Sequence, residues 1–327
     1  MLYPGLYEQV INNALNRELA EIPEARKSTA PIDMAEAAKV LAQYLTDVVQ
    51  KGLENVQDNG GGIEAQIQLA NQIVTTIQNT TQEADFAALG VDQRAEQLLA
   101  LLQQNDPRLA TGKSAKDLDR PETSISQSSL FTGAIHEPQM YTELKKEIVS
   151  ADRIDMLVSF IKWSGLRLIM GELRQFVQSG GELRIITTSY MGATDVKAIE
   201  ELRALPNTKI KVSYDTKRTR LHAKTYVFYR DTGFTTAYVG SSNLSNAAIS
   251  SGLEWNVKVT RKDLSETIEK IAATFESYWN SSEFEYYDEG QLERLTRALK
   301  AEKYSEADHI AIELAFKEPL RPSMVIH

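Results

Sequence analysis

The stretch from residue 153 to residue 280 alternates short runs of β-branched and aromatic residues with longer amphipathic patterns. Six runs have the length and composition of strands: "RIDMLVSFI", "ELRIITTSY", "TKIKVSY", "AKTYVFY", "TTAYVGSS" and "EWNVKVT". Helical spacing is found in "GLRLIMGELRQFVQSGG", "ATDVKAIEELRALPN" and "LSETIEKIAATFESYWN". Alternating strands and helices favour the α/β class, with a mixed β-sheet sandwiched by helices.

The residues before this stretch have a different pattern. Apolar residues recur every three or four positions in "IDMAEAAKVLAQYLTDVVQKGL" and "IEAQIQLANQIVTTIQN", and Asp33 with Glu36 resembles a capping box. A polar, proline-containing segment without periodicity follows and indicates a linker. We therefore predict a helical N-terminal domain over 1–110, a linker over 111–129, the α/β domain over 130–282 and a helical C-terminal extension over 283–327.

Charge is distributed unevenly along the chain, whose formal net charge is −9. Residues 1–110 carry 7 Lys or Arg against 15 Asp or Glu, so the rest of the chain is close to neutral. Within residues 206–230, seven basic residues face the single acid Asp215. A basic stripe of this kind attracts polyanions, and nucleic acid is the partner it predicts. The candidate contacts are Lys211, Lys217, Arg218 and Arg220, with Ser242 from a later segment.

The chain contains no cysteine, which excludes disulfides and thiolate metal ligands and favours a reducing compartment. The first residues, "MLYPGLYEQVINNALNREL", have no basic region followed by an apolar one, and no run of 18 apolar residues occurs later. No spacing of His and carboxylate residues suggests a metal centre. We therefore expect a cytoplasmic protein with no membrane association, no bound metal and no cofactor.

Several polar residues lie at predicted strand ends. His222 and Lys224 are two residues apart, so in a strand their side chains share one face. The next strand ends at Gly240, Asn243 follows, and Glu254 opens the strand after that. Taken singly, each has an ordinary interpretation: an edge histidine, a solvated lysine, a turn. Together they place groups that suit a phosphate at neighbouring strand ends, where a short helix predicted in "LSNAAI" would add backbone N–H donors.

The segments "HAK" at 222–224 and "GSSN" at 240–243 resemble the His-x-Lys and Gly-Ser-x-Asn motif of the phospholipase D superfamily. The resemblance covers roughly Leu130–Ser282 and implies a phospholipase D-like sheet. The family usually has Asp five residues after the Lys; here that position is Tyr229, and Asp231 follows two residues later. Nuclease-like members keep a downstream Glu, which Glu254 matches, so the chain is more similar to them than to the phospholipases.

The resemblance implies a metal-independent phosphodiesterase, a nuclease acting on DNA or RNA, with DNA the favoured substrate of the two. His222 would attack phosphorus to give a phosphohistidine, while Lys224, Asn243 and Ser241 stabilise the non-bridging oxygens. Glu254 would orient His222 or stabilise its cationic form. Because the mechanism needs two histidines and the chain has one motif, we expect a homodimer that shares one active site across a two-fold axis.

Two other functions stay open: a nucleic-acid-binding module that does not cleave, and a phosphatidyltransferase acting on phospholipids. The N-terminal "LYPGLYEQVIN", joined to a single phospholipase D-like domain, resembles the front end of bacterial DEAD/DEAH-type helicases. A phosphate loop is absent, because "TGKS" at 111–114 has Pro107 where the first glycine belongs. The chain is then expected to be a nuclease module of a helicase or defence system, as a fragment or with a separate helicase partner.

Overall fold

The computed structural model describes residues 2–104, 106–110, 112, 114–134, 136–215, 221–245 and 254–303. The chain divides into two compact units, Met1–Leu101 and Leu102–His327. The sequence placed the boundary later, between residues 110 and 130. No helix in the described ranges is long and apolar enough to cross a membrane.

The first unit is helical. Its elements are α1 (Asn13–Ala20), η1 (Glu24–Arg26), α2 (Ala37–Asp58), α3 (Ile63–Thr81) and η2 (Ala84–Leu89). The expected capping box is absent: α2 begins at Ala37 after Glu36, which makes no side-chain cap, and the Asp33 carboxylate instead accepts from the Ala35 N–H at 2.9 Å. Among the described residues of this unit only Ile67 is buried, so its helices contribute little apolar core.

The second unit contains an eight-stranded mixed sheet. Its strands are β1 (Ser129–Phe131), β2 (Arg153–Val158), β3 (Glu182–Thr188), β4 (Thr208–Ser213), β5 (Lys224–Tyr229), β6 (Thr236–Gly240), β7 (Asn256–Thr260) and β8 (Phe284–Tyr286). Their order is β1-β7-β6-β5-β2-β3-β4-β8, in which β2, β3 and β4 run parallel and every other pairing is antiparallel. All six predicted strands are present, and the short β1 and β8 extend the two edges.

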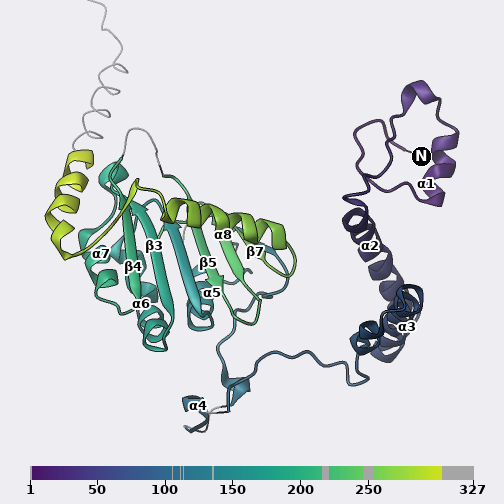
Figure 1. The fold of residues 1–327 in the computed structure, drawn as a ribbon, viewed down its shortest axis with the longest axis horizontal. Helices are drawn as coiled ribbons and strands as arrows, with labels where there is room; N and C mark the ends of the chain where they lie inside the picture. Colours follow the sequence, from purple (N-terminus) through teal and green to yellow (C-terminus); the bar gives the residue numbers. More distant parts are fainter. Residues whose placement is uncertain are drawn as a thin grey trace, which may run out of the picture. The chain divides into compact units, whose positions relative to one another are not determined.

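Helices cover both faces of this sheet (Figure 1). The helices of this unit are α4 (Pro107–Ala110), η3 (Ala115–Asp117), α5 (Met140–Val149), α6 (Trp163–Gln178), η4 (Tyr190–Gly192), α7 (Val196–Arg203), α8 (Ser265–Trp279) and η6 (Glu289–Gln291), and residues 292–303 are also helical. Residues of α5, α6 and α7 pack with one face of the sheet, whereas Ile268, Phe275 and Trp279 of α8 pack with the other. The predicted mixed sheet sandwiched by helices is confirmed.

Alternate side chains of β2 pack against the helices on the two opposite faces of the sheet. Ile154, Met156 and Val158 are buried in the core formed with α5, α6 and α7, while Leu157 packs beneath α8. A strand covered on both faces has apolar residues at consecutive positions, as in Met156–Val158. Asp155 interrupts the pattern and is buried as the ion-pair partner of Arg184 at 2.7 Å. The same parity in β5 directs Lys224 and Tyr226 to the face that α5 and α6 cover.

Candidate active site

The motif residues lie at one end of the central strands, where β2 and β6 end and β5 and β7 begin. The register pairs Val158 with Lys224 across β2 and β5, and Gly240 with Asn256 across β6 and β7. Four chain segments therefore bring polar residues to the same end of the sheet. Gly240 is required there because a Cβ at this position would clash with the Trp255 carbonyl and the Asn256 backbone.

His222 and Lys224 are in direct contact. Lys224 Nζ lies 3.1 Å from each ring nitrogen of His222 and donates to the His222 carbonyl oxygen at 2.9 Å. The strand begins at Lys224, so His222 stands just before β5 rather than within it, and its side chain is exposed while Lys224 is buried. The exposed imidazole and the ammonium beneath it form a pair open to a ligand from solvent.

The ammonium of Lys224 is buried and has no short ion pair. Among the described residues no carboxylate oxygen lies within 4.0 Å of its nitrogen, and its hydrogen-bond partners all belong to His222. Burial lowers the pKa of Lys224 below its ordinary value, and the carboxylate of Glu254 opposes this shift from a longer distance. Glu254 and burial also raise the pKa of Tyr226, with burial the larger cause. Glu254 therefore acts electrostatically on the same small region as Lys224.

Asn243 is held with its amide nitrogen free to donate. The Asn243 side-chain oxygen accepts from the Phe160 N–H at 3.2 Å, at the end of β2, and the side chain is buried. Since the backbone donor fixes the oxygen, the NH₂ group is the part of the amide left for another acceptor. Leu244 continues the contact through a parallel bridge with Ile161, so this segment is anchored beside the loop that precedes α6.

The two motif serines have different surroundings. Ser241 is exposed, and its hydroxyl accepts from the Trp255 N–H at 3.2 Å. Ser242 is fully buried, its hydroxyl accepts from Asn256 Nδ2 at 2.7 Å, and its carbonyl accepts from the Tyr226 hydroxyl at 3.0 Å. Ser242 thus links the motif to β5 and β7 by hydrogen bonds. This corrects its assignment as a nucleic-acid contact, whereas Ser241 remains accessible.

The predicted basic contacts lie largely outside the described residues. Lys217, Arg218 and Arg220 fall in 216–220, and most of the helix expected in "LSNAAI" falls in 246–253. Lys211 is described and is buried beneath α8, where it donates to the Trp279 carbonyl and lies 4.3 Å from the ring centre of Tyr286. A lysine enclosed in this way does not reach a phosphate in solution, which corrects its assignment.

Tyr229, at the position of the usual family Asp, has a packing role. Its ring lies beneath the Arg153 guanidinium, 3.8 Å from ring centre to Cζ, and burial raises the Tyr229 pKa to about 12. Asp231 is exposed, and its backbone N–H donates to the Asp152 carboxylate at 2.7 Å. Tyr229 is the last residue of β5 and Asp231 follows the strand, so both lie at the end of β5 away from Lys224.

A second group of charged residues is buried between α5 and β6–β7. Glu147 is paired with Arg230 at 2.6 Å and with Lys258 at 2.9 Å, and it accepts from the Tyr238 hydroxyl at 3.0 Å. Burial alone would raise the pKa of Glu147, but Arg230 and Lys258 together hold it below the ordinary value. Every charge in this group has an opposite partner, which is the arrangement of a structural network.

No group of three or more His, Asp or Glu side chains in the described ranges is arranged to hold a metal ion. The candidate site has one histidine, one carboxylate, a lysine and an amide. Its positive charge comes from Lys224, so a phosphate oxygen can be stabilised by protein donors.

Comparison with known proteins identifies the central part of this unit. Residues 144–279 match the sequence model of the family described as "Cardiolipin synthase, PLD-like domain". This segment, which is less than half of the chain, is similar to PLD-like domains. It contains the motif residues from His222 to Glu254 and all strands from β2 to β7.

Solved structures similar to the chain include two that it covers almost completely. NucT from Helicobacter pylori is 22% identical over 46% of this chain and 94% of its own, with a TM-score of 0.37. Nuc from Salmonella typhimurium, a phospholipase D family member, is 21% identical over 49% and 99%, with a TM-score of 0.38. The archaeal chromatin protein TrmBL2 is 10% identical over 76% and 71%, with a TM-score of 0.32. None of the curated proteins matches the chain significantly.

Sequence reasoning missed the residues that hold the motif in place. Asn256, Tyr226 and the Phe160 N–H fix Ser242 and Asn243, yet they stand on three different strands or strand ends. The available signals were an Asn at the start of a strand that would otherwise be apolar, and a Tyr two residues after Lys224 on the same face.

Proposed function

We propose that the PLD-like domain is a metal-independent phosphodiesterase, a nuclease that cleaves DNA or RNA, with DNA the favoured substrate, through a phosphohistidine at His222. The observation that supports this most is the position of Lys224. A buried ammonium whose hydrogen-bond partners in the described residues all belong to the exposed His222, with no carboxylate within 4.0 Å, suits a phosphate that brings its own negative charge. The match of residues 144–279 to a PLD-like family adds support at the level of the domain.

In the proposed first step, a neutral nitrogen of His222 attacks phosphorus and the bond from phosphorus to the leaving oxygen breaks. A protonated histidine on the opposite side donates its proton to that oxygen. Water then attacks the phosphohistidine, its proton returns to the second histidine, and His222 is released with a phosphate monoester. Lys224 and the free Asn243 amide donate to the non-bridging oxygens, with the Ser241 hydroxyl exposed beside them.

Glu254 is assigned two contributions in this mechanism. Its carboxylate supports the positive charge of Lys224, as the direction of its effect on the Lys224 pKa shows. We also assign it the orientation of His222, or the stabilisation of the histidine cation that forms during the reaction.

The second histidine is assigned to a second copy of the chain. An exposed apolar patch beside the motif supports this: Leu130, Val239, Trp255 and Val257 lie on the sheet face that α8 covers further along, and each is at least 38% exposed. The patch begins next to Glu254 and Ser241, and burying it between copies would be favourable. We propose a homodimer whose site combines His222, Lys224, Asn243 and Glu254 of both subunits.

Co-expression of differently tagged chains tests the sharing. A purified heterodimer of wild type and His222→Ala is expected to be inactive, and Val257→Glu is expected to give a monomer by sedimentation, while Leu264→Glu at an exposed apolar position outside the patch leaves the dimer intact. A fully active heterodimer, or a monomer that cleaves, contradicts the proposed dimer.

The proposed reaction is tested by incubating wild type and His222→Ala with DNA and with RNA in EDTA. The wild type is expected to cleave DNA in the chelator and His222→Ala to be inactive. Complete loss in EDTA with recovery on addition of Mg²⁺ contradicts the mechanism. Salt-dependent DNA binding without any turnover identifies a binding module instead.

A phosphatidyltransferase is the second candidate, because the matching family is described by a cardiolipin synthase. The same phosphohistidine chemistry transfers a phosphatidyl group when an alcohol replaces the attacking water. Transfer or hydrolysis on phospholipid vesicles, with no cleavage of DNA or RNA, favours this candidate over the nuclease.

We also propose, from the helicase-like front end alone, that the helical first unit links the nuclease to a helicase motor within a helicase or defence system in the cytoplasm. The expected result is that a motor co-purifies with the full chain and not with a chain lacking residues 1–101. Equal recovery with both chains contradicts it.

A further inference from the structure

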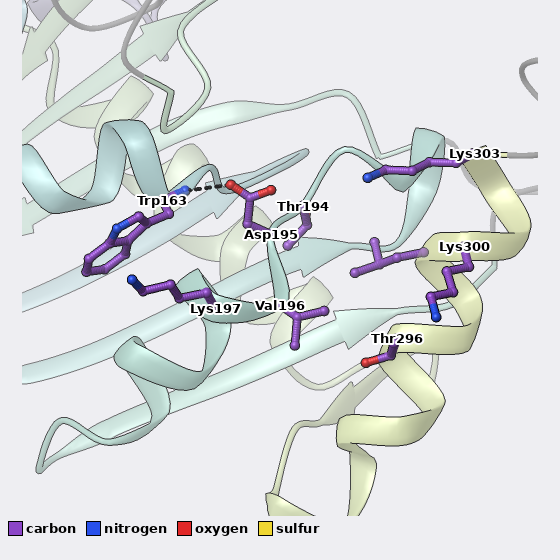
Figure 2. A pocket seen from close by; sticks show the side chains of 9 residues that line it. Trp163, Thr194, Asp195, Val196, Lys197, Thr296, Lys300 and Lys303 are labelled. Carbon is purple, nitrogen blue, oxygen red and sulfur yellow. Dashed lines mark hydrogen bonds between the residues drawn. The ribbon is translucent and has the colours of Figure 1, made fainter.

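A cavity of about 440 Å³ lies between the start of α6 and the helix over residues 292–303 (Figure 2). Its walls are the start of α6, the segment leading into α7 and the helix over residues 292–303, and its lining residues are Trp163, Thr194, Asp195, Val196, Lys197, Thr296, Leu299, Lys300 and Lys303. The volume falls in the range of small-ligand pockets. One nucleotide unit is an occupant of suitable size.

The lining of this cavity is cationic. Three exposed lysines, Lys197, Lys300 and Lys303, line it, and within the described part of the chain none of them forms an ion pair with a carboxylate. The single acid, Asp195, is already engaged: its carboxylate accepts from the Trp163 N–H at 2.9 Å and lies 3.7 Å from Lys162 Nζ. The cavity therefore has an excess of positive charge and favours an anion.

An aromatic surface accompanies these charges. Trp163 is partly exposed at the cavity wall, and Lys197 Nζ lies 4.4 Å from the centre of its ring. In Figure 2, Trp163 and Lys197 lie on the side opposite the helix that carries Thr296, Lys300 and Lys303. A ring beside ammonium groups is the combination that binds a base by stacking and its phosphate by charge.

The cavity adjoins the active site through one short loop. The Phe160 N–H donates to Asn243, the Lys162 N–H donates to the Leu244 carbonyl at 2.8 Å, and Trp163 follows directly. Three residues of chain span at most about 10 Å, so the wall of the cavity lies within a few nucleotides of the amide proposed to hold the reacting phosphate. A strand that occupies one place can reach the other.

We propose that this cavity is a nucleotide subsite, in which Trp163 stacks on a base and Lys300 and Lys303 bind phosphate of the same single strand that is cleaved at His222. The inference rests on the proposed nuclease function. It assigns the strand, rather than a free nucleotide, as the source of the base and phosphate, because the same loop contacts both places.

The test measures binding directly, with the full chain carrying His222→Ala so that the strand stays intact. A labelled short single-stranded oligodeoxynucleotide is titrated in several salt concentrations. Lys300→Ala with Lys303→Ala is expected to weaken binding about ten-fold and to lower the salt slope by about 1.4, at roughly 0.7 per phosphate contact. The matched control is Lys262→Ala with Lys270→Ala, which removes two exposed charges elsewhere and is expected to change binding less than about two-fold. Circular dichroism confirms that each variant is folded.

Fluorescence and a second ligand complete the test. The oligonucleotide is expected to quench Trp163, so Trp163→Phe loses that quenching, and a free nucleoside monophosphate is expected to compete only weakly. The subsite is overturned if both double lysine variants lose oligonucleotide binding equally, or if neither loses it. It is also overturned if a free nucleotide binds as tightly as the strand. If the wild type cleaves and binding is independent of Lys300 and Lys303, only the subsite fails. If binding depends on Lys300 and Lys303 but the wild type does not cleave, the result supports the subsite and contradicts the proposed nuclease function.

Discussion

Lys224 and Lys258 are both buried in the same sheet, yet their surroundings differ completely. Lys258 lies 2.9 Å from Glu147 and 4.0 Å from Glu143, and it donates to the Thr123 hydroxyl at 2.9 Å. Lys224 has no carboxylate within 4.0 Å among the described residues; burial lowers its pKa, and the more distant Glu254 offsets that shift only in part. A buried cation held in short ion pairs supports the fold, whereas one without them costs stability and is available to an incoming anion.

The largest expected effect is on the Lys258 side of this comparison. Glu147→Gln leaves Arg230 and Lys258 buried without their carboxylate, so the free energy of unfolding is expected to fall by about 3–5 kcal/mol. Because the folded-state pKa of Glu147 is lowered, its contribution is present above the ordinary glutamate value and is lost as the pH falls through the folded-state pKa. Urea unfolding of Glu147→Gln and wild type at neutral pH measures this fall in the free energy of unfolding.

Glu269→Gln is the matched control for this prediction, since Glu269 is exposed on α8 and its partner Arg261 is 3.8 Å away. A change within about 0.5 kcal/mol is expected there. If both variants unfold alike, the network around Glu147 is not the support described.

The next effect is on the Lys224 side. Lys224→Ala removes one donor from the developing charge and is expected to reduce turnover by about 10²–10³-fold while weakening binding little. Lys262→Ala serves as control. Changing Lys217 and Arg218, which lie outside the described residues, is instead expected to weaken binding of every DNA sequence and to lower the salt slope. Normal cleavage by Lys224→Ala shows that the site has been misplaced.

The smallest effect concerns pH. The lowered pKa of Lys224 predicts that activity declines on the alkaline side at a pH below the ordinary lysine value, as the ammonium loses its proton. Glu254→Gln removes the carboxylate that raises this pKa, so the decline is expected to move to lower pH. The profile of kcat/KM against pH measures it, and a decline that stays in place or moves upward contradicts the role given to Glu254.

The long strands of the fold could be predicted from the sequence, because the pattern of apolar residues within each strand indicates which of its faces are buried. β2 and β5 are buried on both faces and contain apolar residues at consecutive positions, Met156–Val158 in β2 and Tyr226–Tyr229 in β5. β1 and β8 have only three residues each, too few for a period, and they form by pairing with β7 and β4 far along the chain. Such edge strands depend on tertiary contacts that no local pattern records.

The residues of the candidate site that belong to the motif could be predicted from the sequence. His222, Lys224, Asn243 and Glu254 lie at one end of the central strands, but Ser242 and Lys211 were assigned to the wrong environment. Their neighbours, Asn256 for Ser242 and Trp279 for Lys211, come from distant segments, so burial of these two side chains is invisible in the sequence. The partners of Lys258 are likewise distant, and the contrast with Lys224 appears only in the structure.

Unfolding of Lys224→Met tests the contrast most directly, with Lys258→Met beside it. The three tryptophans, Trp163, Trp255 and Trp279, all belong to the second unit, so their fluorescence in urea reports the unit that holds both lysines. We predict that Lys224→Met unfolds with at least the wild-type free energy, because it removes a charge that burial disfavours and that has no carboxylate within 4.0 Å among the described residues. Lys258→Met is expected to lose stability, because Glu147 then keeps only Arg230 as a cationic partner and Glu143 loses the cation 4.0 Å away. A comparable loss in Lys224→Met would show that its charge is already used by the fold and would contradict its assignment to substrate.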